Sequence, residues 1–219
     1  MDWNYKIFVV GDLRVGKTCL VKRFFKKSFS VNYICTMGMV LSSKTMNVSR
    51  IRTRINVFDM SGAELFKSIW SIHYKNAVGV VLVYDITKLE SYENMLKWYS
   101  DVSIQVNPSA VFILVGNKSD LEMNREVPTE LAKNFAKSHD FLFMETSALK
   151  DENVRQVFQE LSLEIQSFNL GCIYHLENQS RSTVNASSLV NVKPYPRPKL
   201  ITKPRECCPY SCWKILLFG

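Results

Sequence analysis

The sequence predicts an α/β domain with a mostly parallel sheet and helices on both faces of that sheet. Three observations support this fold class. Strand-like and helix-like stretches alternate over residues 4–167, most of the strand-like stretches are continuously apolar, and polar clusters follow them directly. Such alternation is typical of α/β folds, and continuously apolar strands are typical of parallel sheets. Because ligands of these folds bind at the carboxyl ends of the strands, the polar clusters are candidate functional residues.

The first half of the domain contains three predicted strands and one predicted helix. Residues 5–10, YKIFVV, form a buried apolar run. Residues 17–27 place their apolar side chains at helical spacing. Residues 50–59 alternate basic and apolar side chains, as a half-exposed strand does. Residues 78–85, VGVVLVYD, are apolar up to the final Asp and predict a fully buried strand.

The second half continues the alternation. Apolar runs predict strands over residues 110–118 and 141–145. Amphipathic patterns predict helices over residues 91–102, 129–139 and 152–165. Each of these strands ends in polar residues, so the second half adds further candidates for the ligand-binding edge of the sheet.

A glycine-rich loop lies between the first predicted strand and the first predicted helix. Residues 11–18, GDLRVGKT, match the pattern G-x-x-x-x-G-K-[ST]. In this setting successive backbone N–H groups wrap an anion, and the helix N-terminus adds positive potential. Lys17 would neutralise the β- and γ-phosphates of a nucleotide, and the Thr18 hydroxyl would ligate Mg²⁺. The candidate phosphate-binding residues are Leu13, Arg14, Val15, Gly16, Lys17, Thr18 and Cys19.

A second polar cluster, GNKSD at residues 116–120, follows a later apolar strand. An Asp carboxylate can accept hydrogen bonds from both N1–H and the exocyclic N2–H of guanine, a pair of donors that adenine does not offer. Asp120 is therefore the candidate base-reading residue. Asn117 would tether neighbouring loops, and Lys118 would cover the ring. The N-K-x-D pattern is short, and it gains weight from its place after a strand and downstream of the glycine-rich loop.

A third cluster, ETSALK at residues 145–150, follows a short strand, and Ser147 and Ala148 would place a backbone N–H on guanine O6. With these three motifs in this order, the chain resembles a small GTPase of the Ras superfamily, and most of all the Rab family. The segments LVYDIT, SYENMLKWY and LFKSIWSIHYKNA are also similar to Rab sequences. The resemblance covers residues 4–167 and implies a P-loop NTPase G domain with a six-stranded sheet that binds GTP or GDP with Mg²⁺.

The resemblance implies roles for four further residues. Thr36 would ligate Mg²⁺ and touch the γ-phosphate, and Asp59 would hold Mg²⁺ through water. Gly62 would donate its N–H to the γ-phosphate, and Phe29 would pack edge-on against the guanine. Loss of the γ-phosphate would then release the segments around Thr36 and Gly62, which is how such proteins switch.

The sequence departs from the family pattern where hydrolysis takes place. Ala63 occupies the position of the Gln that orients the attacking water, so no side chain there is predicted to act in catalysis. Leu13 replaces a small residue and would crowd the γ-phosphate and the space that an arginine finger enters. Arg14 also replaces a small residue, and it either points to solvent or swings toward the phosphates. Leu149 replaces the usual Lys and would cover the base with an apolar side chain.

Partners are implied by the same resemblance. Effector proteins would bind through the switch regions, residues 31–41 and 60–77, and an exchange factor would load the nucleotide. The usual acidic and aromatic pair after the switch Gly is absent, and Phe58 stands where Rab proteins have Trp. Familiar Rab effectors therefore cannot be assumed. Nucleic acid is excluded as a partner, since the basic surplus is thin and lies in the tail.

Residues 168–219 are predicted to form a flexible, basic, proline-rich tail. They carry seven Lys and Arg against two Asp and Glu, a surplus of +5, whereas residues 1–167 carry 21 against 18, a surplus of +3. Eleven residues follow the pair Cys207 and Cys208, and the last four contain no Cys, so the usual prenylation patterns are absent. Three interpretations stay open: palmitoylation of Cys207, Cys208 and Cys212, insertion of the apolar CWKILLFG terminus into a membrane interface, or no anchor.

Two functions are compatible with these features. The first is a Rab-like switch in vesicle traffic, slow at hydrolysis, at the cytoplasmic face of an intracellular membrane or in the cytosol. The second is a pseudo-GTPase, a binding scaffold locked with GTP. The intact phosphate, metal and base motifs favour nucleotide binding in both cases. Ala63 and Leu13 predict weak intrinsic and poorly stimulated hydrolysis.

Overall fold

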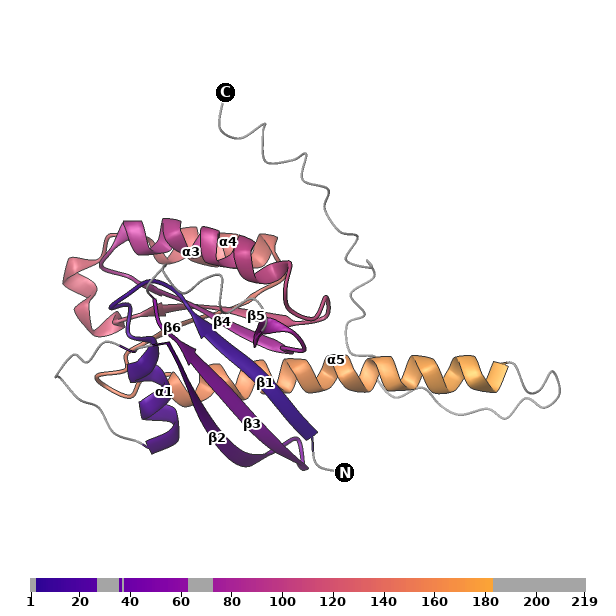
Figure 1. Cartoon of the computed structure of the whole chain (residues 1–219). Coiled ribbons are helices and arrows are strands. Elements are labelled where there is room, and N and C mark those ends of the chain that lie inside the picture. The colour runs from indigo at the N-terminus through magenta and orange to yellow at the C-terminus, as the bar shows by residue number, and fades with distance from the viewer. Residues whose placement is uncertain (1–2, 27–35, 37, 63–72, 183–219) are drawn as a thin grey trace, which may run out of the picture. The chain divides into compact units, whose positions relative to one another are not determined.

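The computed structural model describes residues 3–26, 36, 38–62 and 73–182, the last eleven of them by their backbone alone. The chain divides into two units, Met1–Glu177 and Asn178–Gly219. The first unit contains the sheet and the helices that cover it (Figure 1). It is the unit that carries every nucleotide motif of the sequence.

The predicted strands and helices all appear in the predicted order, and the structure adds the strand β2 and the 3₁₀ helix η2. In order, they are β1 (Trp3–Val10), α1 (Lys17–Lys26), β2 (Met39–Val48), β3 (Ile51–Met60), β4 (Gly79–Asp85), α3 (Leu89–Ser103), β5 (Val111–Asn117), the 3₁₀ helix η2 (Ser119–Asn124), α4 (Thr129–Ser138), β6 (Leu142–Thr146) and α5 (Val154–Ser182). The predicted α/β class is confirmed.

The sheet has six strands in the order β2-β3-β1-β4-β5-β6. All neighbouring strands run parallel except β2, which pairs with β3 in the antiparallel sense. The mostly parallel sheet and its six strands are therefore confirmed. No residue pattern had indicated β2 itself. It lies at the sheet edge and most of its side chains are at least partly exposed, so it lacks the apolar run that marks the buried strands.

Helices cover both faces of the sheet, as predicted (Figure 1). On one face α3 and α4 bury a cluster that includes Phe8, Leu82 and Met95. On the other face α1 and α5 bury a cluster that includes Ile7 and Phe158. Neighbouring residues of one strand thus serve opposite cores, which is why the central strands are apolar throughout. Each fully buried large side chain contributes roughly 1.5–3 kcal/mol, so these clusters hold the strand ends in place.

The helix α5 continues to Ser182, well past residue 167, where the sequence predicted the domain to end. The structure thus places residues 168–182 in a helix, where the sequence predicts the start of a flexible tail. The physical reason is that this stretch contains no proline before Pro194 and a single Gly, Gly171, which a helix tolerates at a cost of about 1 kcal/mol. Within the described residues, no helix has both the length and the apolar composition that crossing a membrane requires.

Candidate functional site

The predicted motifs meet at the carboxyl edge of the sheet. The loop 11–16 follows β1, and Asp59 lies near the end of β3. Asn117 ends β5 and Thr146 ends β6. The parallel registers place Val9 beside Asp59 and Asn117 beside Thr146. The sheet therefore gathers at one edge residues that lie far apart in the sequence.

The glycine-rich loop has a backbone shape that its two glycines permit. Gly16 has a φ of +98°, and a Cβ there would come within 2.2 Å of Asn117 Nδ2. Gly11 has a φ of +142°, and its Cβ would meet the Val83 carbonyl at 2.1 Å. Between them Arg14, an exposed residue, adopts a φ of 65°, which is strained for a side chain with a Cβ.

Lys17 lies buried against this loop, with 5% of its surface exposed. Its ammonium donates hydrogen bonds to the carbonyls of Gly11 at 2.9 Å and Asp12 at 2.6 Å. The positive charge is therefore fixed close to the backbone that would wrap a phosphate. Such a fixed cation and the N-terminus of α1 both favour an anion at this loop.

Three oxygen-bearing side chains from separate segments meet beside Lys17. The Thr18 hydroxyl donates to Asp59 Oδ2 at 2.6 Å, and the hydroxyls of Thr18 and Thr36 lie 2.7 Å apart. Asp59 is 1% exposed, and its Oδ1 makes no hydrogen bond among the described residues. Hydroxyl and carboxylate oxygens are the hard ligands that Mg²⁺ takes. A buried carboxylate oxygen without a partner is what such a cation would satisfy, so these residues fit Mg²⁺.

Burial raises the pKa of the Asp59 carboxyl, while the Thr18 hydrogen bond and the positive charges of Lys17 and Lys22 lower it to a smaller extent. Because the folded-state pKa lies above the ordinary value, the protonated carboxyl favours the folded state. This contribution to stability is complete below the ordinary aspartate pKa and is lost as the pH rises through the folded-state pKa. Ionising this buried carboxylate without a cation is therefore a cost to the fold. A bound divalent cation would offset that cost.

We expect Asp59→Asn to raise the unfolding temperature in EDTA at pH 7, because it removes this buried charge. The difference should vanish below about pH 4, where aspartate is protonated in both states. With GDP present throughout, adding Mg²⁺ should stabilise the wild type more than the variant, since a ligand of the folded state shifts unfolding by mass action. Thermal unfolding over pH, with and without Mg²⁺, measures both effects. Equal stabilisation of the two proteins by Mg²⁺ would contradict the assignment.

The segment after β3 packs directly on the glycine-rich loop. The Ser61 N–H donates to the Gly38 carbonyl at 2.8 Å, which joins this segment to the start of β2. A Cβ at Gly62 would lie 2.4 Å from the Leu13 nitrogen and 2.7 Å from the Asp12 carbonyl oxygen. Gly62 thus allows close contact between two loops that both face the expected phosphate. The Leu13 side chain is 43% exposed at this junction.

The side chain of Asn117 joins the motifs that are candidates for reading the base. Its Nδ2 donates to the Val15 carbonyl at 2.8 Å, and its Oδ1 accepts from the Thr146 hydroxyl at 3.2 Å and the Ala148 N–H at 3.3 Å. The side chain of Asn117 therefore joins the loops that follow β1, β5 and β6. Ala148, one of these partners, is itself buried.

Asp120 and Lys118 are held by neighbouring polar groups. The Ser147 hydroxyl donates to Asp120 Oδ1 at 2.5 Å, which links the two base loops directly. Lys118 adopts a φ of 70°, and its ammonium lies 2.5 Å from Asp85 Oδ2 at the end of β4. Both contacts fix charged side chains at the rim where a base would enter.

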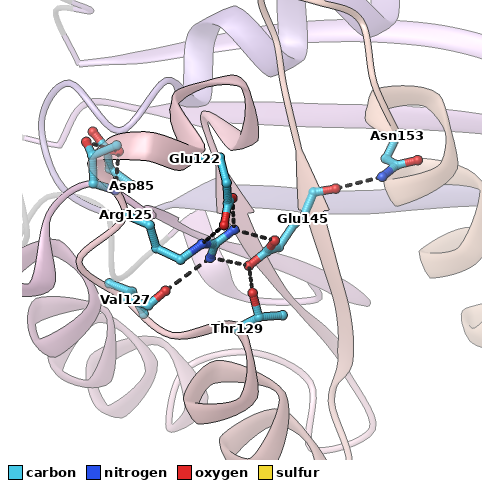
Figure 2. A network of polar contacts seen from close by, with 8 residues as sticks. Asp85, Glu122, Arg125, Val127, Thr129, Glu145 and Asn153 are labelled. Carbon is cyan, nitrogen blue, oxygen red and sulfur yellow. Dashed lines mark hydrogen bonds and ion pairs between the residues drawn. The ribbon is translucent and has the colours of Figure 1, made fainter.

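Arg125 joins the segments on either side of these loops, in a network that the sequence did not indicate (Figure 2). Its guanidinium contacts Glu122 of η2 at 2.6 Å and Glu145 of β6 at 2.8 Å. Glu145 also accepts from Thr129, and its carbonyl accepts from Asn153. The two carboxylates raise the pKa of Arg125 further, through hydrogen bonds. The network joins the segment after Asp120 to the strand before Ser147.

Arg23 performs a similar task from α1, since its guanidinium donates to the carbonyls of Ala148 at 2.9 Å and Leu149 at 2.8 Å. Cys19, the last residue predicted for the phosphate loop, is half-buried, and burial raises the pKa of its thiol. Other predicted residues lie outside the described part of the chain: Ala63, Phe29, and Cys207, Cys208 and Cys212 of the tail.

Comparison with known proteins places this chain in a family. Residues 6–167 match the Ras family. The chain is 35% identical over 214 residues to Ras-related protein RABA4b of Arabidopsis thaliana, covering 96% of this chain and 94% of that protein. It is 33% identical over 215 residues to Ras-related protein Rab11A of Lotus japonicus, with the same coverage. It is also 34% identical to GTP-binding protein YPTM1 of Zea mays, covering 94% of this chain and 97% of that protein.

These relatives match along nearly the whole chain, and the fold and the sheet-edge motifs described above agree with the match. The resemblance stated from the motifs is therefore confirmed. The chain belongs to the Ras family of small GTPases, on its Rab branch.

Proposed function

We propose that this chain is a GTP- and GDP-binding switch in vesicle traffic that hydrolyses GTP slowly. The observation that carries the proposal is the contact among Thr18, Thr36 and Asp59. It joins the glycine-rich loop, the segment before β2 and the end of β3 at a site that suits Mg²⁺. A nucleotide with Mg²⁺ bound there would hold the Thr36 segment, and loss of the γ-phosphate would release it.

In hydrolysis, water attacks the γ-phosphorus, the bond to the β–γ bridging oxygen breaks, and GDP and phosphate are formed. Lys17 would neutralise charge on the phosphate oxygens, and the Gly62 N–H would bond the γ-phosphate. Magnesium, when bound by Thr18, Thr36 and Asp59, would supply further charge neutralisation. These groups stabilise the phosphate without aligning the water, so binding is supported better than rapid hydrolysis.

The slow rate follows from two substitutions. Ala63 has no polar atom with which to hold the attacking water. The backbone nitrogen of Leu13 lies where Gly62 packs on the glycine-rich loop, so its branched side chain would project from the loop that faces the expected γ-phosphate. In related phosphoryl transfer an arginine finger contributes about 10³–10⁵ in rate, and Leu13 would obstruct its entry.

Effectors and an exchange factor are proposed to bind through residues 31–41 and 60–77. Within these regions Val40 and Leu41 are 50% and 54% exposed, and Leu41 pairs with Phe58 across β2 and β3. This apolar surface carries no acidic side chain between Gly38 and Phe58. An acidic switch region would select partners with basic groups, and this surface has no acidic side chain to do so. We infer that effectors of this chain bind it through an apolar surface.

The tail is proposed to bring the protein to the cytoplasmic face of an intracellular membrane. Its surplus of basic residues suits an anionic surface, and Cys207, Cys208 and Cys212 are candidate acylation sites. One weak anchor gives marginal attachment, so the basic residues and the acyl groups would act together. Without them the protein would stay in the cytosol.

The nucleotide that co-purifies with the protein tests this proposal against the locked scaffold. The bound nucleotide is released by denaturation and identified by chromatography with guanine and adenine standards. A mixture rich in GDP supports a cycling switch. GTP alone supports a scaffold locked in one state, and the absence of guanine nucleotide, together with no binding of added GDP, overturns the nucleotide site.

A further inference from the structure

Asp12, within the glycine-rich loop, is bonded to a helix that no nucleotide motif includes. Its Oδ2 accepts from Asn94 Nδ2 at 2.8 Å, and its Oδ1 accepts from Trp98 Nε1 at 2.7 Å. Asn94 and Trp98 lie one turn apart on α3, so they present their N–H groups on the same side of the helix. Both carboxylate oxygens of Asp12 are thereby engaged by one helix.

The main chain of Asp12 contacts two parts of the expected phosphate site. Its carbonyl oxygen accepts from the buried Lys17 ammonium at 2.6 Å. Its carbonyl group also lies against Gly62: a Cβ built on Gly62 would come within 2.5 Å of the Asp12 carbonyl carbon. Asp12 therefore contacts three parts of the domain. Its side chain bonds α3, and its peptide group contacts Lys17 at the start of α1 and Gly62 after β3.

The α3 side of this contact is rigid. Trp98 is 2% exposed and belongs to the core that α3 and α4 bury against the sheet. The indole therefore cannot follow a moving loop, and its N–H holds the carboxylate in one place. Hydrogen bonds to a charged acceptor are about twice as strong as neutral ones, so the loop is firmly attached at this point.

We propose that Asp12 is a positioning residue that fixes the first turn of the glycine-rich loop to α3, and that this attachment slows nucleotide release. This inference rests on the proposed nucleotide site. The bonds of Asn94 and Trp98 hold the Asp12 peptide, which in turn holds the Lys17 ammonium where the phosphates would lie. Arg14, two residues further on, has a strained backbone with a φ of 65°. Without the attachment at Asp12, relief of this strain would favour a loop conformation that no longer fits the phosphates.

The test measures release of fluorescently labelled GDP in excess Mg²⁺. Trp98→Phe keeps an aromatic ring and removes one N–H, and it should speed release about tenfold, the factor that corresponds to one hydrogen bond to a charged group. Asp12→Ala should speed release further. In the Asp12→Ala background, Trp98→Phe should add nothing, because its partner is already absent.

The control is Tyr92→Phe, which removes one hydroxyl from another buried ring of α3. Tyr92 packs edge-on against Tyr84 and Phe135 rather than against Asp12. This variant should release GDP at the wild-type rate, whatever its effect on the unfolding temperature. A second readout is the ratio of affinities for GDP and inosine diphosphate, which differ only at the base. That ratio should not change in Trp98→Phe, since the contact lies at the phosphate end.

The outcomes separate this inference from the proposed function. If wild type binds no GDP, both are overturned. If wild type binds GDP and Trp98→Phe releases it as slowly, the inference alone fails. It also fails if Trp98→Phe and Tyr92→Phe speed release equally, or if the effects of Trp98→Phe and Asp12→Ala multiply independently. The inference is supported if Trp98→Phe releases GDP faster than wild type and Tyr92→Phe does not, if the ratio of GDP to inosine diphosphate affinity is unchanged, and if Trp98→Phe adds nothing in the Asp12→Ala background.

Discussion

Ala63→Gln is expected to raise the single-turnover rate of GTP hydrolysis by about 10- to 100-fold, since a misplaced reactant costs roughly that factor. A Gln amide can accept from the attacking water and donate to a phosphate oxygen, whereas Ala63 can do neither. The remaining machinery is already gathered: Lys17 beneath the loop, and Thr18, Thr36 and Asp59 in contact. The added amide would therefore act on a bound and oriented nucleotide.

A matched control is Ala63→Asn, which carries the same amide on a side chain shorter by one methylene. If reach as well as polarity is required, this variant should hydrolyse GTP at nearly the wild-type rate. Rates are measured on protein loaded with GTP, followed by chromatography of the nucleotide over time. A wild-type rate equal to that of Ala63→Gln would show that the chain does not depend on this position, and the proposal of slow hydrolysis would then be wrong.

Leu13 limits what Ala63→Gln can restore. Its nitrogen lies where the segment containing Gly62 packs on the loop, and its side chain is 43% exposed there. Leu13→Gly should therefore have little effect alone and a large effect on stimulated hydrolysis when combined with Ala63→Gln. The stimulated rate needs room for an inserted arginine as well as an oriented water.

Much of the fold could be predicted because its signals are local. The central strands are buried on both faces, so they are continuous apolar runs, and the helices have an apolar side at helical spacing. The edge strand β2 could not be predicted in this way, because its side chains are mixed and half-exposed. The length of α5 was also missed, since a change in composition at residue 168 does not by itself end a helix.

The candidate site divides along the same line. Residues within short motifs, such as Lys17, Asn117 and Asp120, could be proposed as site residues from spacing and chemistry. Their supports could not, because each is a contact between distant segments. Trp98 reaches Asp12 across 86 positions, and Arg23 reaches Ala148 across 125. No local pattern records such a pair, and three-dimensional placement is needed to find it.

Asp120→Asn is the sharpest test of the proposed base site, because it changes one acceptor to a donor and leaves the shape of the side chain unchanged. We expect this variant to lose affinity for GDP by about 10²- to 10⁴-fold, since a site built to hydrogen-bond one group strongly rejects a partner that leaves it unpaired. The carboxylate offers two acceptors to N1–H and N2–H of guanine. The amide offers one acceptor and one donor, and its donor would face the donor of guanine.

Xanthine reverses this mismatch, because it carries a carbonyl in place of the 2-amino group. Asp120→Asn should therefore bind xanthosine diphosphate more tightly than GDP, whereas wild type should prefer GDP. Competition of both nucleotides against fluorescently labelled GDP or xanthosine diphosphate measures the two preferences. If the variant keeps wild-type affinity for GDP, Asp120 does not read the base.

Ser147→Ala is the matched control for this exchange. The Ser147 hydroxyl donates to Asp120 Oδ1 at 2.5 Å and accepts from the Lys150 N–H at 3.0 Å, so it orients the carboxylate without supplying its chemistry. Loss of this hydroxyl should lower the affinity for GDP about tenfold, the order expected for one hydrogen bond to a charged group. The preference for guanine over xanthine should stay intact. Asp120→Asn alone should invert the preference, because in the proposed site the base would be read by the two acceptors of Asp120. Ser147 bonds one of them directly, whereas Asn117 and Arg125 join the neighbouring loops through bonds to other residues.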